Sequence, residues 1–129
     1  RVRAAGTLPV AIGEQLGNRF DFWNYVRADA ADYLQPNVWK VGGVTEWLKI
    51  AHMAQHANLP VAPHNALELS AHLVGAGPKG WMIENIFRGH LADFGIVHAA
   101  PRVVNARRTR PARARDPCRP LTGSNPREE

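Results

Sequence analysis

Short apolar runs alternate with helix-like segments along the first two-thirds of the chain. Four apolar runs have the length of strands: 8–14, 33–35, 59–64 and 81–84. Three segments between them repeat apolar residues at the helical i, i+3, i+4 spacing: 19–31, 46–57 and 67–75. Clusters of Gly and Pro separate these elements. The order β-α-β-α-β-α-β, with strands that are apolar throughout, predicts an α/β fold with a parallel sheet.

The helical pattern also predicts which side chains are buried. The first helix should bury Phe20 and Trp23. The buried stripe predicted for the second helix is Trp47, Ile50, Ala51 and Ala54, and that for the third is Leu69, Leu73 and Ala76. Thr45 is the expected N-cap of the second helix, and Asn58 is its expected stop. All four tryptophans are expected to be packing residues.

A polar residue stands at or just after the end of each predicted strand. These residues are Glu14, Asn37, His64 and Glu84, at intervals of 23, 27 and 20 residues. The carboxyl ends of parallel strands meet at one edge of the sheet, where α/β proteins place their chemistry. An open doubly wound sheet and part of a (β/α) barrel both fit the element order. The compact spacing favours the barrel, in which one βα unit takes roughly 30 residues.

Charge divides the chain into two parts. The net charge is +5 over 129 residues, but residues 1–88 hold eight basic and seven acidic residues. Residues 89–129 hold eight arginines against four acidic residues, and this Arg/Pro/Ala-rich sequence shows no periodic pattern of apolar residues. We therefore predict a folded domain at 1–88 and a basic tail at 89–129 that is disordered or a non-native end. A small interaction module working through this tail is the alternative.

The remaining composition excludes several classes of protein. No run of ~18 apolar residues is present, so no membrane partner is expected. The folded part lacks the basic surface of a nucleic-acid-binding domain, so no nucleic-acid partner is expected either. The single cysteine, Cys118, rules out an internal disulfide framework and predicts a cytoplasmic protein.

The strand-end residues and their flanks resemble one protein family. The segments are Gly13-Glu14, then Gln35-Pro-Asn-Val-Trp-Lys-Val-Gly-Gly-Val-Thr-Glu-Trp-Leu-Lys-Ile-Ala, then Val61-Ala-Pro-His64, then Trp81-Met-Ile-Glu84. In this order they are similar to the enolase superfamily, in its mandelate racemase/muconate lactonizing enzyme branch. The resemblance implies the C-terminal half of a (β/α)7β barrel, strands five to eight, at residues 1–88.

The resemblance also implies roles for individual residues. Glu14 would be a ligand of Mg²⁺, and His64 would be the acid/base residue. Asn37 stands where many members carry an aspartate that partners the histidine. Glu84 would contact the carboxylate of the substrate. Apart from the resemblance, Lys40 in the loop after the second predicted strand is a candidate contact for a substrate anion, and a solvated lysine is the alternative. An amide orients an imidazole without stabilising its positive charge, so we expect His64 to be a weaker base than in relatives with aspartate.

The implied reaction is removal of a proton α to a carboxylate, assisted by Mg²⁺. Dehydration of a sugar acid (an aldonate or aldarate) is the leading expectation, with racemisation or epimerisation of a hydroxy acid as the alternative. The complete enzyme is expected to be a homo-oligomer. The other metal ligands and the second-strand base would lie in the half of the barrel that this chain does not contain. A truncated remnant without activity of its own is therefore the third interpretation.

Overall fold

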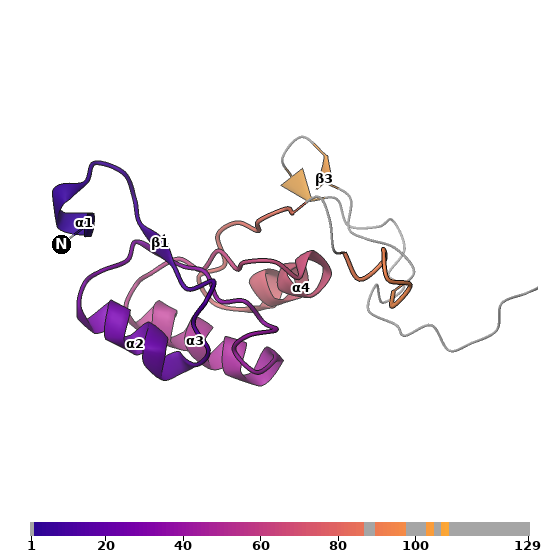
Figure 1. Cartoon of the computed structure of the whole chain (residues 1–129), viewed down its shortest axis with the longest axis horizontal. Coiled ribbons are helices and arrows are strands. Elements are labelled where there is room, and N and C mark those ends of the chain that lie inside the picture. Colours follow the sequence, from indigo (N-terminus) through magenta and orange to yellow (C-terminus); the bar gives the residue numbers. More distant parts are fainter. Residues whose placement is uncertain (1, 87–89, 98–102, 105–106, 109–129) are drawn as a thin grey trace, which may run out of the picture.

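The fold is built on a short parallel sheet. The computed structural model describes residues 2–86, 90–97, 103–104 and 107–108 (Figure 1). Strand β1 (Ala11–Ile12) pairs in parallel with β2 (Tyr33–Leu34), with Ala11 opposite Tyr33. Two isolated parallel bridges, Leu34 to Val61 and Val61 to Gly80, extend the sheet. The four predicted strand regions therefore lie side by side in chain order, which confirms the predicted parallel arrangement.

The regular strands are shorter than the apolar runs that predicted them. Residues 59–64 and 81–84 form no ladder beyond single bridges, and β2 ends two residues before Pro36. Proline lacks the backbone N–H that a ladder needs, and Pro60 and Pro63 flank the bridge at Val61. The chain nevertheless continues each strand direction to the polar residue that follows it.

Helix boundaries follow local capping chemistry. Helix α2 (Arg19–Arg27) begins after Asn18, whose side-chain oxygen accepts hydrogen bonds from the N–H groups of Phe20 at 2.9 Å and Asp21 at 3.2 Å. Helix α3 spans Val44–His56, and Gly43 is its N-cap. The predicted N-cap at Thr45 is therefore wrong. Gly43 has φ 100°, a conformation that side chains disfavour, and the helix starts two residues earlier than it would with Thr45 as the N-cap.

The two remaining helices are α4 and α1. Helix α4 spans Leu67–Ala76, and Leu73 is buried on its inner face. Ala76, predicted on that face, is exposed. Helix α1 (Val2–Ala5) was not predicted, because residues 1–7 carry no apolar period.

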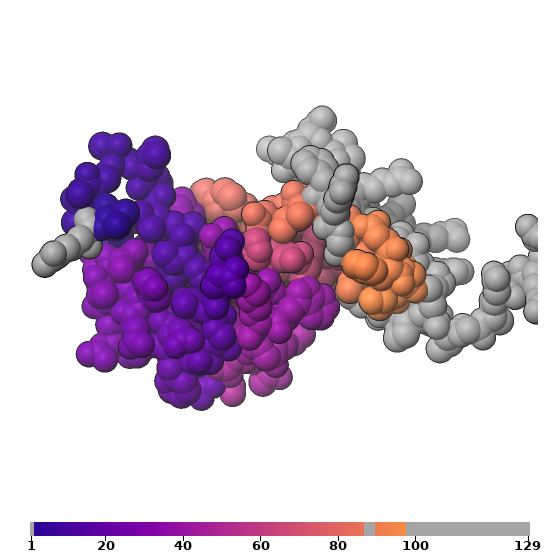
Figure 2. All heavy atoms as spheres, viewed as in Figure 1, coloured from indigo at the N-terminus to yellow at the C-terminus, as the bar shows by residue number. Residues whose placement is uncertain are grey.

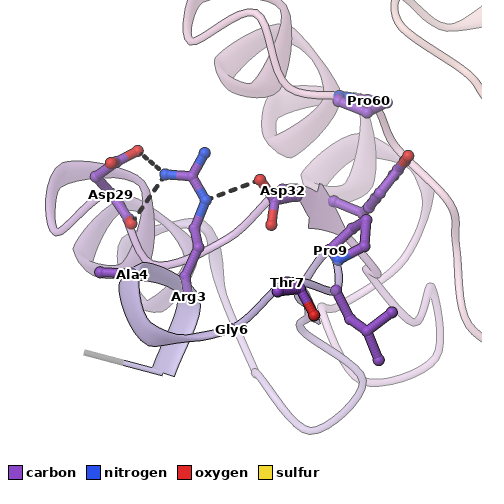
Figure 3. Close-up of a pocket in the computed structure, with 10 residues that line it drawn as sticks. Arg3, Ala4, Gly6, Thr7, Pro9, Asp29, Asp32 and Pro60 are labelled. Carbon is purple, nitrogen blue, oxygen red and sulfur yellow. Dashed lines mark hydrogen bonds and ion pairs between the residues drawn. The ribbon is translucent and has the colours of Figure 1, made fainter.

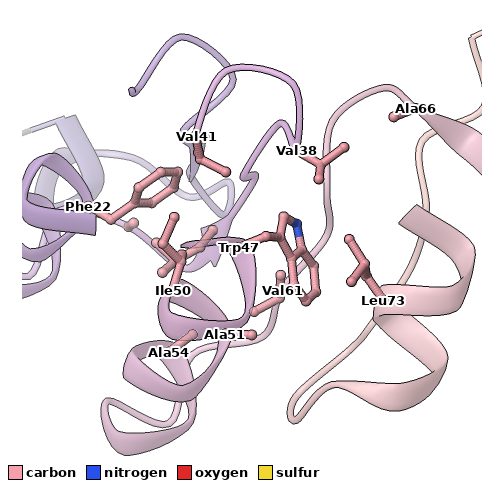
Figure 4. Packing of buried hydrophobic residues seen from close by; sticks show 12 residues of the cluster. Phe22, Val38, Val41, Trp47, Ile50, Ala51, Ala54, Val61, Ala66 and Leu73 are labelled. Carbon is pink, nitrogen blue, oxygen red and sulfur yellow. The ribbon is translucent and has the colours of Figure 1, made fainter. Parts of the chain in front are cut away.

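The core forms between the sheet and α3 (Figure 4). The predicted stripe of α3 is confirmed, because Trp47, Ile50, Ala51 and Ala54 are all fully buried. On the same face of the sheet, Leu34 and Val61 are also fully buried. Burial of a large side chain of this kind stabilises the fold by roughly 1.5–3 kcal/mol. Trp47 packs at the centre of this cluster.

Helix α2 buries Phe22 instead of the predicted Phe20 and Trp23. Arg19 Nη1 lies 2.7 Å from each carboxylate oxygen of Glu46, and this ion pair joins the start of α2 to α3. Phe22 then points into the core, and Phe20 is 63% exposed under the Arg19 guanidinium, 4.5 Å from the ring centroid. Of the four tryptophans only Trp47 is buried, so the general expectation of tryptophan packing is wrong for the other three in this structure.

Beyond residue 86 the structure describes three short stretches. Residues 90–97, orange in Figure 2, form turns that bury Val97. Strands β3 (Val103–Val104) and β4 (Arg107–Arg108) pair antiparallel within the predicted tail. The rest of that tail lies outside the described residues. In the part of the chain that the structure describes, no helix is long and apolar enough to cross a membrane.

Candidate active site

Three of the four strand-end residues meet at the carboxyl edge of the sheet. The imidazole Nδ1 of His64 contacts the carboxylate of Glu84 and lies 3.7 Å from Glu14 Oε2. The side chain of His64 is 18% exposed, whereas those of Glu14 and Glu84 are 52% and 42% exposed. The arrangement is a recessed imidazole flanked by two carboxylates that reach solvent. The shared sheet edge predicted from the sequence therefore brings these three residues together.

A glycine turn places Glu14. Gly13 has φ 129°, and its carbonyl accepts a hydrogen bond from Leu16 N–H at 3.0 Å. A Cβ at Gly13 would stand 2.3 Å from the Phe22 ring. Only glycine fits both this conformation and this space, so the close packing of α2 on the end of β1 fixes where Glu14 leaves the sheet.

A tight turn holds His64 from the other side. Asn65 and Ala66 both have left-handed conformations, with φ 62° and 50°. Ser70 Oγ donates a hydrogen bond of 2.7 Å to the carbonyl of Asn65. Ala66 is nearly fully buried, and α4 begins at the next residue. His64 therefore lies between the bridge at Val61 and the start of α4 at Leu67.

The contact with Glu84 defines how His64 presents its other nitrogen. A carboxylate accepts a hydrogen bond, so it favours the hydrogen on Nδ1. In the neutral ring this leaves the lone pair on Nε2, which is then the atom able to accept a proton. Glu84 therefore orients the imidazole in the present structure, a task that the sequence resemblance had given to position 37.

Asn37 organises the loop after β2. Its side chain is 3% exposed, and its Oδ1 accepts a hydrogen bond from Trp39 N–H at 3.0 Å. Its backbone carbonyl accepts hydrogen bonds from the N–H groups of Lys40 and Val41, both at 3.0 Å. The Lys40 ammonium contacts the side-chain oxygen of Gln15 in the loop after β1. Asn37 thus shapes the loop that carries Lys40, and the roles predicted for both residues stay predictions.

The donor chemistry fits part of a magnesium site. Mg²⁺ binds oxygen ligands in a near-octahedral shell, and the exposed carboxylate of Glu14 is a ligand of the right kind. Among the described residues, no group of three or more His, Cys, Asp or Glu side chains is arranged to hold a metal ion. Glu14 therefore fits as one ligand of a shared site, and it cannot hold the ion by itself.

A hollow lies at the opposite end of the strands from the His64 cluster (Figure 3). There Arg3 Nε donates a hydrogen bond of 2.8 Å to Asp32 Oδ1 and also pairs with Asp29. Asp32 Oδ2 accepts a 2.8 Å hydrogen bond from Val10 N–H. That backbone bond, followed by Arg3, lowers the pKa of the Asp32 carboxyl. These contacts join the amino ends of β1 and β2, so this hollow is structural and separate from the His64 cluster.

One buried acid, Glu68, was not predicted from the sequence. Glu68 in the first turn of α4 is fully buried, and neither carboxylate oxygen has a hydrogen-bond partner among the described residues. His90 Nδ1 lies 3.7 Å from Glu68 Oε1. An acid in the first turn of a helix reads as an ordinary partner of the helix dipole, so only the structure distinguishes it.

The fold and the site define a parallel α/β protein with a histidine flanked by two carboxylates at the carboxyl edge of its sheet. The sequence model of the family described as "Enolase C-terminal domain-like" matches residues 1–114, and the chain belongs to this family. A curated relative, the D-galactonate dehydratase of Ralstonia pickettii (strain 12J), is 42% identical over 64 residues, which cover 50% of this chain and 17% of the relative. The L-talarate/galactarate dehydratase of Salmonella typhimurium is 35% identical over 83 residues, 64% of this chain and 21% of the relative.

Solved structures agree with this assignment. The L-talarate dehydratase of Polaromonas sp. JS666, complexed with Mg and L-glucarate, superposes with a TM-score of 0.71 and 34% identity. The match covers 82% of this chain and 28% of that one. An enolase from Bradyrhizobium, complexed with magnesium and mandelic acid, gives a TM-score of 0.70 at 30% identity. The chain thus spans less than a third of these relatives, and magnesium is bound together with L-glucarate or mandelic acid in the two structures.

Proposed function

We propose that this chain carries the acid/base half of a magnesium-dependent sugar-acid dehydratase active site. The observation that supports this most is the His64–Glu84 contact, with Glu14 3.7 Å away at the same edge. It unites a general acid/base and a hard oxygen ligand, the two groups needed to remove a proton α to a carboxylate. The chain would form the C-terminal half of a (β/α)7β barrel, strands five to eight.

His64 would move the proton. Its Nε2 lone pair accepts the proton from the carbon α to the substrate carboxylate, and the two electrons of the C–H bond remain on the substrate as the enediolate. In a dehydration, the β-hydroxyl then leaves with a proton as water, and a carbon–carbon double bond forms. Imidazolium at His64 is able to supply that proton, and Glu84 holds the ring in place through Nδ1.

Glu14 would contribute one ligand to the metal. A bound Mg²⁺ lowers the energy of the dianionic enediolate by offsetting its charge. Lys40 projects from the loop shaped by Asn37, and it would attract a second anionic or hydroxyl-rich part of the substrate. The other ligands and the second base would come from the first half of a barrel, so the 129 residues alone are expected to show no turnover.

A chimera tests the proposal directly. Residues 8–86 replace the matching segment of the Salmonella L-talarate/galactarate dehydratase, and Mg²⁺-dependent dehydration of galactarate is measured. We expect turnover that falls by about 10²–10⁴-fold in His64→Asn. The matched control is His52→Asn, on the exposed side of α3, which should leave the rate unchanged. A folded chimera with full activity in His64→Asn would refute the role of His64.

The same chimera separates dehydration from racemisation. If the α-hydrogen exchanges with solvent deuterium while no dehydrated product forms, the hydroxy-acid racemase or epimerase interpretation replaces the dehydratase. If a folded chimera shows neither exchange nor turnover, the chain is a non-catalytic remnant.

A further inference from the structure

A second acid–imidazole contact joins the two stretches of chain that supply the His64–Glu84 contact. Glu68 lies four residues after His64, in the first turn of α4. His90 lies six residues after Glu84. His90 Nδ1 is 3.7 Å from Glu68 Oε1. The same two stretches are therefore tied twice, and the acid and the imidazole change places between the two ties.

Residues 90–97 form a compact unit, which we call the latch. Asp93 N–H donates to the carbonyl of His90 at 3.0 Å, and Asp93 Oδ2 accepts a hydrogen bond of 3.0 Å from His90 N–H. The side chain of His90 is 17% exposed, and Val97 is nearly fully buried. The family match over residues 1–114 includes this segment. The latch is therefore a folded part of the protein, with a covered side chain at each of its ends.

The buried carboxylate of Glu68 depends on this contact. Its two oxygens are covered by the chain itself and have no hydrogen-bond partner among the described residues. A buried carboxylate alone is strongly unfavourable, whereas a proton shared with a neighbouring base offsets that cost. Within the described ranges, His90 is the one basic side chain that pairs with Glu68. Because both oxygens are already covered, a group from outside cannot replace His90 while the latch is in place.

The first turn of α4 is continuous with the turn that holds His64. Ser70 Oγ donates to the carbonyl of Asn65, and Ser70 N–H donates to the carbonyl of Ala66, both at 2.7 Å. Ala66 is the N-cap of α4, yet it has a left-handed conformation and makes no side-chain cap hydrogen bond. The usual local stabilisation of a helix start is therefore missing, and a contact from outside the helix contributes more to holding this turn.

We propose that the Glu68–His90 pair fastens the latch to α4 and thereby keeps the His64–Glu84 contact closed. With the pair intact, the two stretches of chain are fixed at two points. When the pair breaks, the first turn of α4 is free to move, and His64 separates from Glu84. The pair thus sets how long the candidate site stays assembled. This device uses contacts within the chain and does not depend on the proposed reaction.

Hydrogen exchange of the full 129-residue chain, followed amide by amide, tests the latch. We expect exchange at residues 64–70 and 93–96 to rise by at least about tenfold in His90→Leu, because breaking a buried pair leaves an uncompensated charge. The amides of α3 should keep their rates, which separates opening of the latch from global unfolding. The matched control is His72→Leu, at an exposed histidine of α4, which should change neither stretch.

A double variant shows whether the pairing is the cause. Glu68→Met removes the buried charge, so adding His90→Leu to it should leave exchange nearly unchanged. An equal rise in both backgrounds would overturn the proposal, as would wild-type rates in His90→Leu.

A second variant keeps the proposal testable if His90→Leu fails to fold. Val97→Ala weakens the apolar end of the latch without leaving an unpaired charge, and it should raise exchange in the same two stretches. A rise confined to residues 93–96, with residues 64–70 unchanged, would refute the link between the latch and His64.

Discussion

Trp47 offers a prediction in which two opposing effects can be separated. Its side chain is fully buried at the centre of the core, yet its indole Nε1 has no hydrogen-bond partner among the described residues (Figure 4). A buried N–H without a partner costs about 1–3 kcal/mol. Trp47→Phe removes this donor and keeps most of the apolar ring.

In Trp47→Phe the cost of the new cavity and the gain from removing the unpaired N–H nearly cancel, whereas in Trp47→Ala the cavity cost is much larger. Replacing indole by phenyl leaves a void on the order of 40 Å³, which costs about 1 kcal/mol at about 24 cal/mol per Å³. Removing the unpaired donor offsets this loss, so Trp47→Phe should change the free energy of unfolding by no more than about 1 kcal/mol. Trp47→Ala leaves the full cavity and should cost about 3–5 kcal/mol.

Urea unfolding followed by circular dichroism at 222 nm measures both variants without relying on tryptophan fluorescence. The m-value should stay constant, so that midpoints report stability directly. A Trp47→Phe variant as unstable as Trp47→Ala would refute the reasoning, because the indole N–H would then have to make a stabilising hydrogen bond.

Three further predictions concern the ends of the strands. Asp32 has a carboxyl pKa lowered from 3.8, so its charged form stabilises the fold above that value and the benefit is lost as pH falls through the folded-state pKa. The melting-temperature gap between wild type and Asp32→Asn should therefore be largest near neutral pH and close as the solution is acidified; a gap independent of pH would contradict this. Gly13→Ala should cost about 2–4 kcal/mol from strain and overlap, measured by urea unfolding. Its control, Gly42→Ala, has φ 90° but open space around it and should cost less, about 1 kcal/mol. In the chimera, Asn37→Asp should move the lower limb of the pH–rate profile to higher pH, since a carboxylate favours protonated His64; an identical profile would argue against any coupling of the two.

The sequence predicts the buried face of α3 well because the helical spacing of its apolar residues is sufficient to identify that face. Trp47 and Ile50 lie at helical spacing within a long helix, and the apolar face that they define is the face that packs into the core. Helix α2 is different. Its buried face is decided by contacts with distant parts of the chain, and the Arg19–Glu46 ion pair joins residues 27 positions apart. No local period predicts that Phe22 is the buried residue.

The candidate site likewise has one part that the sequence predicts and one part that it does not. The rule that parallel strands end at one edge predicts that Glu14, His64 and Glu84 come together, and they do. The rule does not say which neighbour bonds the imidazole, because that depends on turn geometry within a few ångströms. The buried Glu68 was missed for a related reason, since its burial depends on how α4 packs and not on its sequence neighbours.

The left-handed turn after His64 has a consequence for how the protein opens. Alanine in this conformation costs about 1 kcal/mol or more relative to glycine, and Ala66 follows Asn65 in the same strained region. The free energy of local unfolding is therefore low at the turn that holds His64, whereas fully buried side chains stabilise α3. Amide hydrogens at residues 64–66 should exchange with solvent well before those of α3, so the molecule would lose the His64–Glu84 contact in small, reversible openings that leave the core folded.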